Sequence, residues 1–395
     1  MIDELRKQGA SRSRFGLFFM PVVVLLVAVG WSAFWFYASS RIGDQLDGWR
    51  AREAQSGRIY DCGKRSVSGF PFRFEVRCSD VSVALVSQTA EQAASQTRLN
   101  ARLADIVVIA QIYDPKKLIA DFTAPFTLAE RDEAPSISAS WTKGRSSVAG
   151  LPDVPQRVSL EFDNPAIDYV AGAVPTPLFR GKHTELHSRL AEGSAADNPV
   201  IEAVLQLAQG SVQGIHPLAA EPFDADIRVQ LRGLKDFSPK PWPDRFREIQ
   251  AAGGRIDIVQ SRISQGALLS VAAGSLGISP SGRLNGELQM TIAGVEKILP
   301  AFGIDKLLEQ GVSQSAVDKI APGVNAGEVN KLLGALNRAI PGLDKVVRQN
   351  AGAGLALLGP ATTLEGRKAQ SIPVRFVDGN VFVGPLRIAQ VPPLF

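Results

Sequence analysis

Histidine is the residue of this chain best suited to acid–base or metal chemistry, and two of the three histidines lie close together. His183 and His187 are four residues apart, whereas His216 stands alone. The alternating pattern around the pair predicts a β-strand, in which the two side chains share a face but lie about 13 Å apart, at roughly 3.3 Å per residue. That separation does not chelate one ion, and the sequence has no H-E-x-x-H pattern. We therefore interpret the histidines as surface residues and assign no metal ligand.

Glycine-rich segments are the next candidates for chemistry. Neither 352–354 (GAG) nor 274–277 (GSLG) carries a phosphate-loop or dinucleotide-binding pattern. The sequence also lacks a G-x-S-x-G nucleophile motif. We therefore expect no cofactor and no catalytic residue, and predict that the protein is not an enzyme. The alternative is a periplasmic hydrolase whose site is assembled from residues distant in sequence.

Cys62 and Cys78 are the two cysteines of the chain. They cannot complete a four-ligand zinc site by themselves, and their spacing is not C-x-x-C. In an oxidising compartment they are expected to form one disulfide. It would close a loop of about 16 residues and stabilise the fold by about 3 kcal/mol. A reactive thiol pair is the alternative.

The longest apolar stretch predicts a membrane anchor. Residues 15–40 carry no charge and lie between Arg14 and Arg41. As a helix, residues 15–37 extend about 35 Å, enough to cross a hydrocarbon core of about 30 Å with some tilt. Aromatic residues gather at 31–37, which fits the headgroup level where the helix would leave the membrane. A cleaved signal peptide is the alternative, although its apolar region is usually only about 7–15 residues long.

Charge then predicts the topology of the chain. Positive residues precede the apolar stretch, so residues 1–14 are expected to form a cytoplasmic tail. Residues 15–40 would be a single-pass signal anchor in the inner membrane, and 41–395 would lie in the periplasm. This location agrees with the expected disulfide.

Alternating apolar and polar residues predict antiparallel sheet in most of the remaining chain. The segment 200–208 also fits a helix. A turn is expected at 114–117, and Asp378-Gly379 predicts a hairpin. The tract 148–152 (VAGLP) echoes 67–71 (VSGFP). The predicted strands are 60–62, 72–78, 81–85, 104–113, 118–126, 137–141, 158–162, 184–190, 201–207, 227–231, 255–262, 267–278, 283–293, 374–377 and 381–383.

Helical periodicity is confined to a few segments. Short helices are expected at 41–55, at 241–250 before Gly253-Gly254, and several times within about 295–358. The predicted fold is therefore α+β. It has an N-terminal transmembrane helix and then a large curved antiparallel β-sheet domain with short C-terminal helices packed on it.

The apolar face of such a sheet must be covered. If the helices of 295–358 cover it incompletely, an apolar groove remains, and on a membrane-tethered domain this suggests a lipid ligand. A fully packed core without a ligand is the alternative. The composition is globular, with 45% apolar and 21% charged residues, a net charge of +4 and a pI near 9.1. Outside the cytoplasm we expect no nucleic acid partner. The expected partners are the inner membrane, phospholipid and other envelope proteins.

Several short motifs resemble those of a bacterial envelope family. They are the N-terminal span, the Cys-x15-Cys hairpin with 67–73 (VSGFPFR), the strand meander after Gly253-Gly254 with 281–286 (SGRLNG), and the terminal segments 378–380 (DGN), 384–386 (GPL) and 392–394 (PPL). In these features the chain resembles domain of unknown function 2125, over most of its length after the span. The resemblance carries over no activity and no catalytic residues.

The long-sheet texture is also similar to that of AsmA-like envelope proteins. That similarity implies extended sheets with an apolar inner face, proposed to handle phospholipid or to support outer-membrane biogenesis. This chain is much shorter than the large lipid bridges, which argues against an envelope-spanning conduit. We predict a non-enzymatic, membrane-anchored periplasmic protein that binds lipid or serves as a scaffold in envelope biogenesis.

Overall fold

The computed structural model describes residues 15–87, 96–130, 133–195, 197–214, 217–237, 242–294, 327, 359–383 and 386–395. The predicted helices of 295–358 lie outside the described residues, apart from the single position 327. His216 and the glycines of 352–354 also lie outside them. The packing of those helices on the sheet therefore stays a prediction.

The chain begins with one continuous helix, α1 (Phe15–Gln55), of 41 residues. The apolar segment and the expected short helix at 41–55 are not separate elements. The helix continues through Ser39 and Ser40, whose hydroxyls donate to the carbonyls of Phe36 and Tyr37 within it. By length and composition α1 could cross a membrane, and no other helix in the described ranges could.

Two shorter helices are also described, α2 (Pro217–Ala220) and α3 (Trp242–Ala251). Helix α3 confirms the amphipathic helix predicted at 241–250. It ends before Gly253, whose φ of +62° is typical of a helix C-terminus. Ile249 is the buried residue of this helix.

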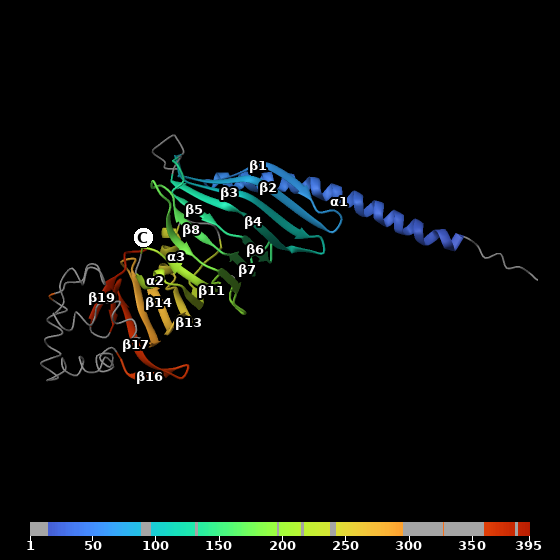
Figure 1. Cartoon of the computed structure of the whole chain (residues 1–395). Helices are drawn as coiled ribbons and strands as arrows, with labels where there is room; N and C mark the ends of the chain where they lie inside the picture. The colour runs from blue at the N-terminus through green and yellow to red at the C-terminus, as the bar shows by residue number, and fades with distance from the viewer. Residues whose placement is uncertain are drawn as a thin grey trace, which may run out of the picture.

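All the strands belong to one antiparallel sheet that curves from blue β1 to red β19 (Figure 1). The first half contains β1 (Arg58–Ser68), β2 (Arg73–Ser87), β3 (Gln96–Gln111), β4 (Asp114–Glu130), β5 (Ile137–Ser140), β6 (Lys143–Ala149), β7 (Arg157–Asp163), β8 (Ala166–Tyr169), β9 (Thr176–Arg180) and β10 (His183–Leu190). The second half contains β11 (Ile201–Val212), β12 (Phe223–Arg232), β13 (Arg255–Gln265), β14 (Leu268–Ile278), β15 (Leu284–Ala293), β16 (Ala361–Leu364), β17 (Arg367–Val377), β18 (Asn380–Val383) and β19 (Leu386–Gln390).

Three pairs of short strands are the halves of longer strands that bend in the middle. The halves are β5 with β6, β7 with β8, and β9 with β10. The β7–β10 and β8–β9 pairings keep one register across the bend, as do β6–β7 and β5–β8. The sheet therefore runs from β1 to β4, through these three bent strands, and on through β11–β15, β17, β18 and β19, with β16 paired to β17.

The bends line up into a crease across the sheet. Left-handed backbone occurs on it at Asp80 (φ 54°), Asn164 (φ 50°) and Gln209 (φ 49°). The N–H of Asn164 donates to the carbonyl of Lys182 at 2.9 Å, so hydrogen bonding continues along the crease.

The apolar residues change phase at this crease. In β2, for example, Val76 precedes it at an even position, and Val81 follows it at an odd position. A regular strand would send these two side chains to opposite faces. Helix α1 contacts the hairpin on both sides of the crease, through Trp35 on Phe74 and Trp49 on Tyr60. The crease thus keeps the apolar residues on one face of the sheet, although the alternation of apolar and polar residues shifts by one residue there.

Several sequence expectations require correction, and the segments predicted separately at 72–78 and 81–85 form the single strand β2. The turn predicted at 114–117 is wrong, because β3 and β4 are joined by the two residues Ile112 and Tyr113 and β4 starts at Asp114. The continuations β8 and β9 and the whole of β6 were not predicted, since their residues alternate poorly. Segment 200–208 is a strand, which settles that ambiguity. The predicted disulfide, the 255–293 meander and the 378–379 hairpin are confirmed.

The echo between 67–71 and 148–152 corresponds to a repeated turn conformation. Gly69 and Gly150 have φ values of 104° and 105°, and the following Phe70-Pro71 and Leu151-Pro152 peptides are both cis. A Cβ at Gly69 would lie 2.7 Å from the carbonyl oxygen of Arg73, so the turn requires glycine there. Both turns lie at the same end of the sheet, because Lys117 at the start of β4 pairs with Ala149.

Candidate functional site

An apolar row runs across the sheet in matched register. Each residue of the row lies opposite the next one on the neighbouring strand, so the row spans the strands from β1 to β12. Most of its members are half-buried, but Leu186 remains 41% exposed. The row consists of eight apolar residues, Val67, Val76, Val108, Ala120, Leu160, Leu186, Leu205 and Ile227, and one serine, Ser146 on β6.

The apolar face continues beyond this row into the second half of the sheet. Ile256 on β13, which is 41% exposed, pairs with Leu231 on β12 and Leu276 on β14. Farther along, Ile372, Val374 and Val381 form a buried cluster. The face is therefore packed at the β17–β18 end and more open in the middle.

The opposite face is polar in the same register. A second row lies one residue away from the apolar row on each strand and therefore on the opposite face. In this second row, Arg145 is flanked by Asp121 and Glu161 on the neighbouring strands. Arg145 donates to Asp121 at 2.6 Å, which raises the pKa of the guanidinium through that hydrogen bond. The row continues through Glu185 to Gln206 and Asp226. Alternation has therefore separated one polar from one apolar face across many strands.

The two histidines belong to this polar face and share a carboxylate. The Nε2 atoms of His183 and His187 lie 2.6 and 2.9 Å from the two oxygens of Glu185. The Nδ1 atoms contact Asp163 Oδ1 at 2.6 Å and Ser159 Oγ at 2.9 Å, respectively. The structure confirms that the histidines share a face and shows a hydrogen-bonded line along β7 and β10.

The electrostatics of this line stabilise the charged states. The hydrogen bond to Glu185, and then that to Asp163, raise the pKa of His183 above its ordinary value of 6.5. The bonds from His187 and His183 lower the pKa of Glu185. Within the described ranges no group of three His, Cys, Asp or Glu residues has metal-binding geometry. A protonated His183 between two carboxylates is consistent with an ion-pair ladder.

Sequence reasoning identified the histidines but missed their partners. Strand alternation alone places Glu185 on the face of His183 and His187, so the sequence was sufficient to predict Glu185 as their neighbour. Ser159 and Asp163 come from another strand, and only the β7–β10 register, which pairs them with His187 and His183, brings them in.

The Ser159–His187–Glu185 contacts resemble part of a hydrolase triad, but the surrounding backbone differs from one. Ser159 lies in the middle of β7 and is paired with Ser147 on β6 and with His187 on β10. The backbone N–H groups around it therefore serve the β-ladders. An acyl-transfer site needs free N–H or side-chain donors at the developing oxyanion, and this flat strand face offers no such backbone donors.

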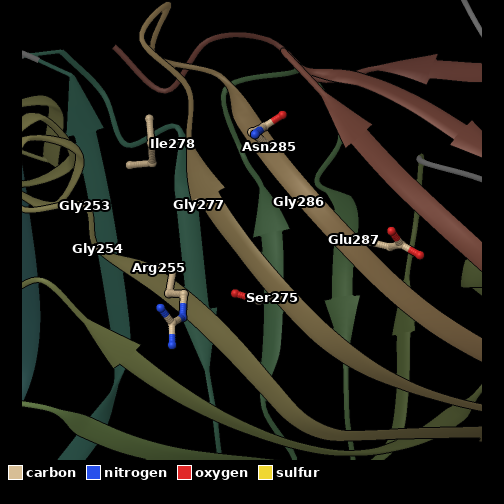
Figure 2. A pocket seen from close by; sticks show the side chains of 9 residues that line it. All are labelled: Gly253, Gly254, Arg255, Ser275, Gly277, Ile278, Asn285, Gly286 and Glu287. Carbon is tan, nitrogen blue, oxygen red and sulfur yellow. The ribbon is translucent and has the colours of Figure 1, made fainter.

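A cleft of about 490 Å³ lies between the end of α3 and the β13–β15 meander (Figure 2). Gly253 and Gly254 line one side, and Gly277 of the expected glycine segment and Gly286 line the sheet side. The backbone of β15 approaches closely here, since a Cβ at Gly286 would lie 2.1 Å from the carbonyl oxygen of Ser275. Arg255 and Glu287 supply the charges that line the cleft, but Arg255 is already paired with Asp257 at 2.8 Å. The cleft has no histidine or cysteine in its wall.

Helix α1 is fastened to the first hairpin by aromatic and charged contacts. Trp35 is 5% exposed, stacks on Phe74 at 5.5 Å, and packs edge-on against Phe70. Its Nε1 donates to the carbonyl of Arg73 at 3.0 Å, and Trp31 Nε1 donates to that of Pro71 at 2.8 Å. The C-terminal half of α1 is therefore part of the sheet domain.

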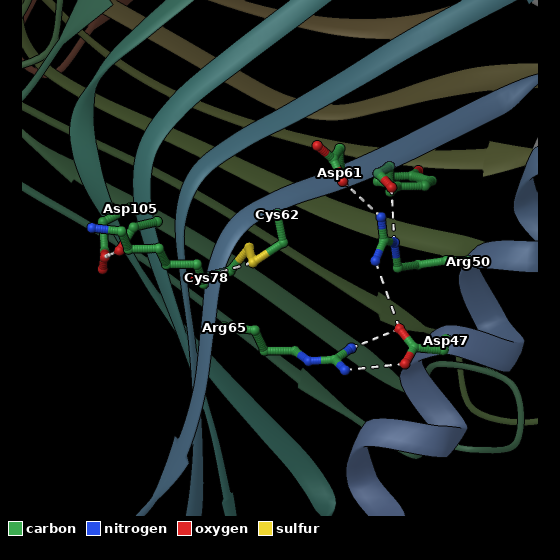
Figure 3. The surroundings of a disulfide bond; sticks show 10 residues. Asp47, Arg50, Asp61, Cys62, Arg65, Cys78 and Asp105 are labelled. Atoms are coloured by element: carbon green, nitrogen blue, oxygen red, sulfur yellow. Dashed lines mark hydrogen bonds and ion pairs between the residues drawn. A yellow bond between two sulfur atoms is a disulfide. The ribbon is translucent and has the colours of Figure 1, made fainter.

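Farther along the helix, ion pairs complete the junction around the disulfide (Figure 3). Arg65 donates to both carboxylate oxygens of Asp47, at 2.7 and 3.0 Å. These bonds lower the pKa of Asp47. The predicted disulfide joins Cys62 and Cys78 on β1 and β2, within the strand pair that carries Arg65. The covalent link and the ion pairs hold the same hairpin.

Comparison with known families identifies the chain. Residues 35–392 match a family described as "Uncharacterized protein conserved in bacteria (DUF2125)". The chain belongs to this family. The resemblance in the short sequence motifs is thereby confirmed. The DUF2125 match begins at Trp35, a residue that fastens the helix to the hairpin, so the C-terminal half of α1 and the sheet lie within one matched region. A search of curated proteins found none that matches the chain.

Proposed function

We propose that this DUF2125 protein is a non-enzymatic, membrane-anchored envelope protein whose apolar sheet face binds the acyl chains of phospholipid. The observation that carries the proposal is the register-matched apolar face, with Leu186 and Ile256 each 41% exposed. If this row of largely apolar side chains faced water, little apolar surface would be buried and the row would contribute little to stability. It fits a long apolar ligand running across the strands.

The proposal places the sheet in the periplasm, with α1 in the inner membrane and residues 1–14 in the cytoplasm. Three features support it. The first 14 residues carry an excess of positive charge, α1 has the length and composition of a span, and Cys62 and Cys78 are joined. The contacts of Trp35 favour an anchor that stays attached over a cleaved signal peptide, since cleavage after the apolar stretch would remove this ring, which is 5% exposed and packed on the first hairpin.

We propose no cofactor and no catalytic residue. The alternative hydrolase would have to use the Ser159–His187–Glu185 line, which is the arrangement on the polar face closest to one. The engagement of the neighbouring N–H groups in β-ladders favours the non-enzymatic reading. A second form of the proposal needs no bound lipid. In it, the protein serves as a scaffold that binds protein partners in envelope biogenesis.

Native mass spectrometry of the full chain, released from membranes in mild detergent, tests the lipid proposal. Adducts with phospholipid masses are expected, and the variant Leu186→Asp should lose most of them. Gln206→Asp is the matched control, because Gln206 lies on the adjacent polar row of the next strand and is exposed. Absence of lipid from the wild-type chain would contradict lipid binding and leave the scaffold role.

A further inference from the structure

The turns at one end of the sheet gather next to the membrane-exit part of α1. The β1–β2 turn contains Phe70 and Phe72, and the β3–β4 turn contains Tyr113. The N–H of Ile112 donates to the carbonyl of Phe72 at 3.2 Å, which joins the two turns. Figure 1 shows both, blue and teal, at the same end of the sheet beside α1. Phe72 and Tyr113 protrude, with 66% and 77% of their surface exposed, whereas Phe70 is 49% exposed and packs against Trp35 and Phe36.

The length of the free part of α1 sets the depth of these turns. Trp31 is hydrogen-bonded to Pro71, so the β1–β2 turn lies level with Trp31 on the helix. Residues 15–30, the uncharged part before that level, extend only about 24 Å at 1.5 Å per residue. A hydrocarbon core is about 30 Å thick. For α1 to cross it, the bilayer must reach past Trp31, and the turns must reach the bilayer.

We propose that Phe70, Phe72 and Tyr113 insert into the headgroup–acyl boundary as a second membrane contact beside the helix. This inference rests on the proposed anchoring of α1. Phe and Tyr rings suit that boundary because both are apolar, and the tyrosine ring also carries a polar hydroxyl at its end.

The charges around the turns are compatible with a lipid surface. Arg73, Lys116 and Lys117 are exposed there, together with Asp114 and Asp153. Lys116 lies 3.6 Å from Asp153 across the neighbouring turn, so this acid is partly neutralised. Arg73 is paired with Glu75 at 2.5 Å, and Lys117 adds a further positive side chain that anionic headgroups attract.

The second contact would fix the sheet relative to the bilayer. With only α1 inserted, the domain could rotate about the helix axis. Insertion of the two turns beside the helix would prevent this rotation. The apolar face then starts at the bilayer, because Phe74, Ala110 and Leu118 lie on β2, β3 and β4 close to the two turns and pair in one row. Acyl chains could pass from the membrane onto the face without crossing water.

Depth-dependent quenching of a fluorophore tests this proposal on the full chain. Single cysteines introduced as Phe72→Cys and Tyr113→Cys carry an environment-sensitive label, while the native cysteines stay in their disulfide. Val174→Cys is the matched control. It is 74% exposed, but lies beyond β8, at the far end of the strands. Val27→Cys reports on the anchor itself. The chains are reconstituted in vesicles of phosphatidylcholine and phosphatidylglycerol that contain nitroxide-labelled lipid.

The expected result is several-fold stronger quenching by shallow nitroxide lipid at 72 and 113 than at 174, with protection of both labels from iodide in the buffer. If 72 and 113 behave like 174 while 27 is quenched by deep nitroxide, the second contact is wrong and the anchor stands. If 27 also behaves like 174, both the anchor and the inference that rests on it are wrong.

Discussion

The indole Nε1 of Trp35 donates a hydrogen bond to the backbone carbonyl of Arg73 at 3.0 Å, linking a helix to a strand 38 residues later in the chain. This bond makes helix α1 and the first hairpin one unit. The sheet is therefore held in a defined position relative to α1 and does not hang from it on a flexible linker.

Replacing Trp35 should loosen the hairpin. Trp35→Ala removes a buried ring and leaves the Arg73 carbonyl without its donor, so we expect a loss of about 3 kcal/mol in local stability. Hydrogen–deuterium exchange of residues 64–78 in the full chain measures it. Trp242→Ala is the control, since Trp242 is 73% exposed. Equal exchange in the two variants would show that the helix and the hairpin are not coupled.

The disulfide should add to the same stability. Alkylation of the chain without reductant should leave Cys62 and Cys78 unmodified. Reduction should lower the free energy of unfolding of the hairpin by about 3 kcal/mol, as expected for closing a loop of this size. The double variant Cys62→Ala/Cys78→Ala separates loss of the bond from effects of the reductant. Ready labelling without reductant would remove the disulfide and weaken the periplasmic assignment.

The histidine line should make local stability depend on pH in two directions. Because folding raises the pKa of His183, its stabilisation is present below the unfolded value of about 6.5 and is lost as pH rises through the raised value. Glu185 has a lowered pKa, so its contribution is present above about 4.5 and is lost as pH falls through the lowered value. The β7–β10 pair should therefore be most stable between these limits.

NMR titration of selectively labelled histidine measures this effect. Glu185→Gln should lower the pKa of His183 toward 6.5, since Glu185 is the largest cause of its rise. Glu202→Gln is a suitable control because Glu202 pairs with Arg189 and not with a histidine. An unchanged pKa of His183 in Glu185→Gln would contradict the hydrogen-bonded line.

Local patterns predicted the elements of this fold better than their connections. Strict alternation predicted the β13–β15 meander, the two parts of β2 and the centre of β12, and Asp378-Gly379 marked a hairpin correctly. The strand β6 (KGRSSVA) was missed because Gly144 and Ser146 occupy the positions on its apolar face, so the segment does not alternate. Gly144 there faces Phe162 and Trp141, which leave no room for a side chain.

The candidate site was less accessible from sequence because it depends on register. Leu160, Leu186 and Leu205 lie on different strands, and their alignment in one row follows from pairings that no local pattern specifies. The phase shift at the crease also hides from the sequence that two short strands are halves of one longer strand. The shift requires left-handed residues such as Asn164 between the halves, and the sequence pattern there predicts separate strands.

Topology can be tested with a reporter fused after Phe395. Alkaline phosphatase, which needs its own disulfides, should be active in this fusion, and a cytoplasmic reporter such as green fluorescent protein should be dark. Moving the positive charges of residues 6–14 to the other flank of α1 should reverse both signals. Activity of the cytoplasmic reporter in the unaltered chain would overturn the orientation.

Photo-crosslinking in living cells tests the central claim most directly. A photoreactive amino acid at Leu205, on the apolar row, should form adducts with phospholipid in the full chain. The same group at Gln206, the next residue and on the polar face, should form none. Lipid adducts at 205 and not at 206 are the predicted result; equal labelling at the two positions, or no lipid at either, would contradict a lipid-binding face.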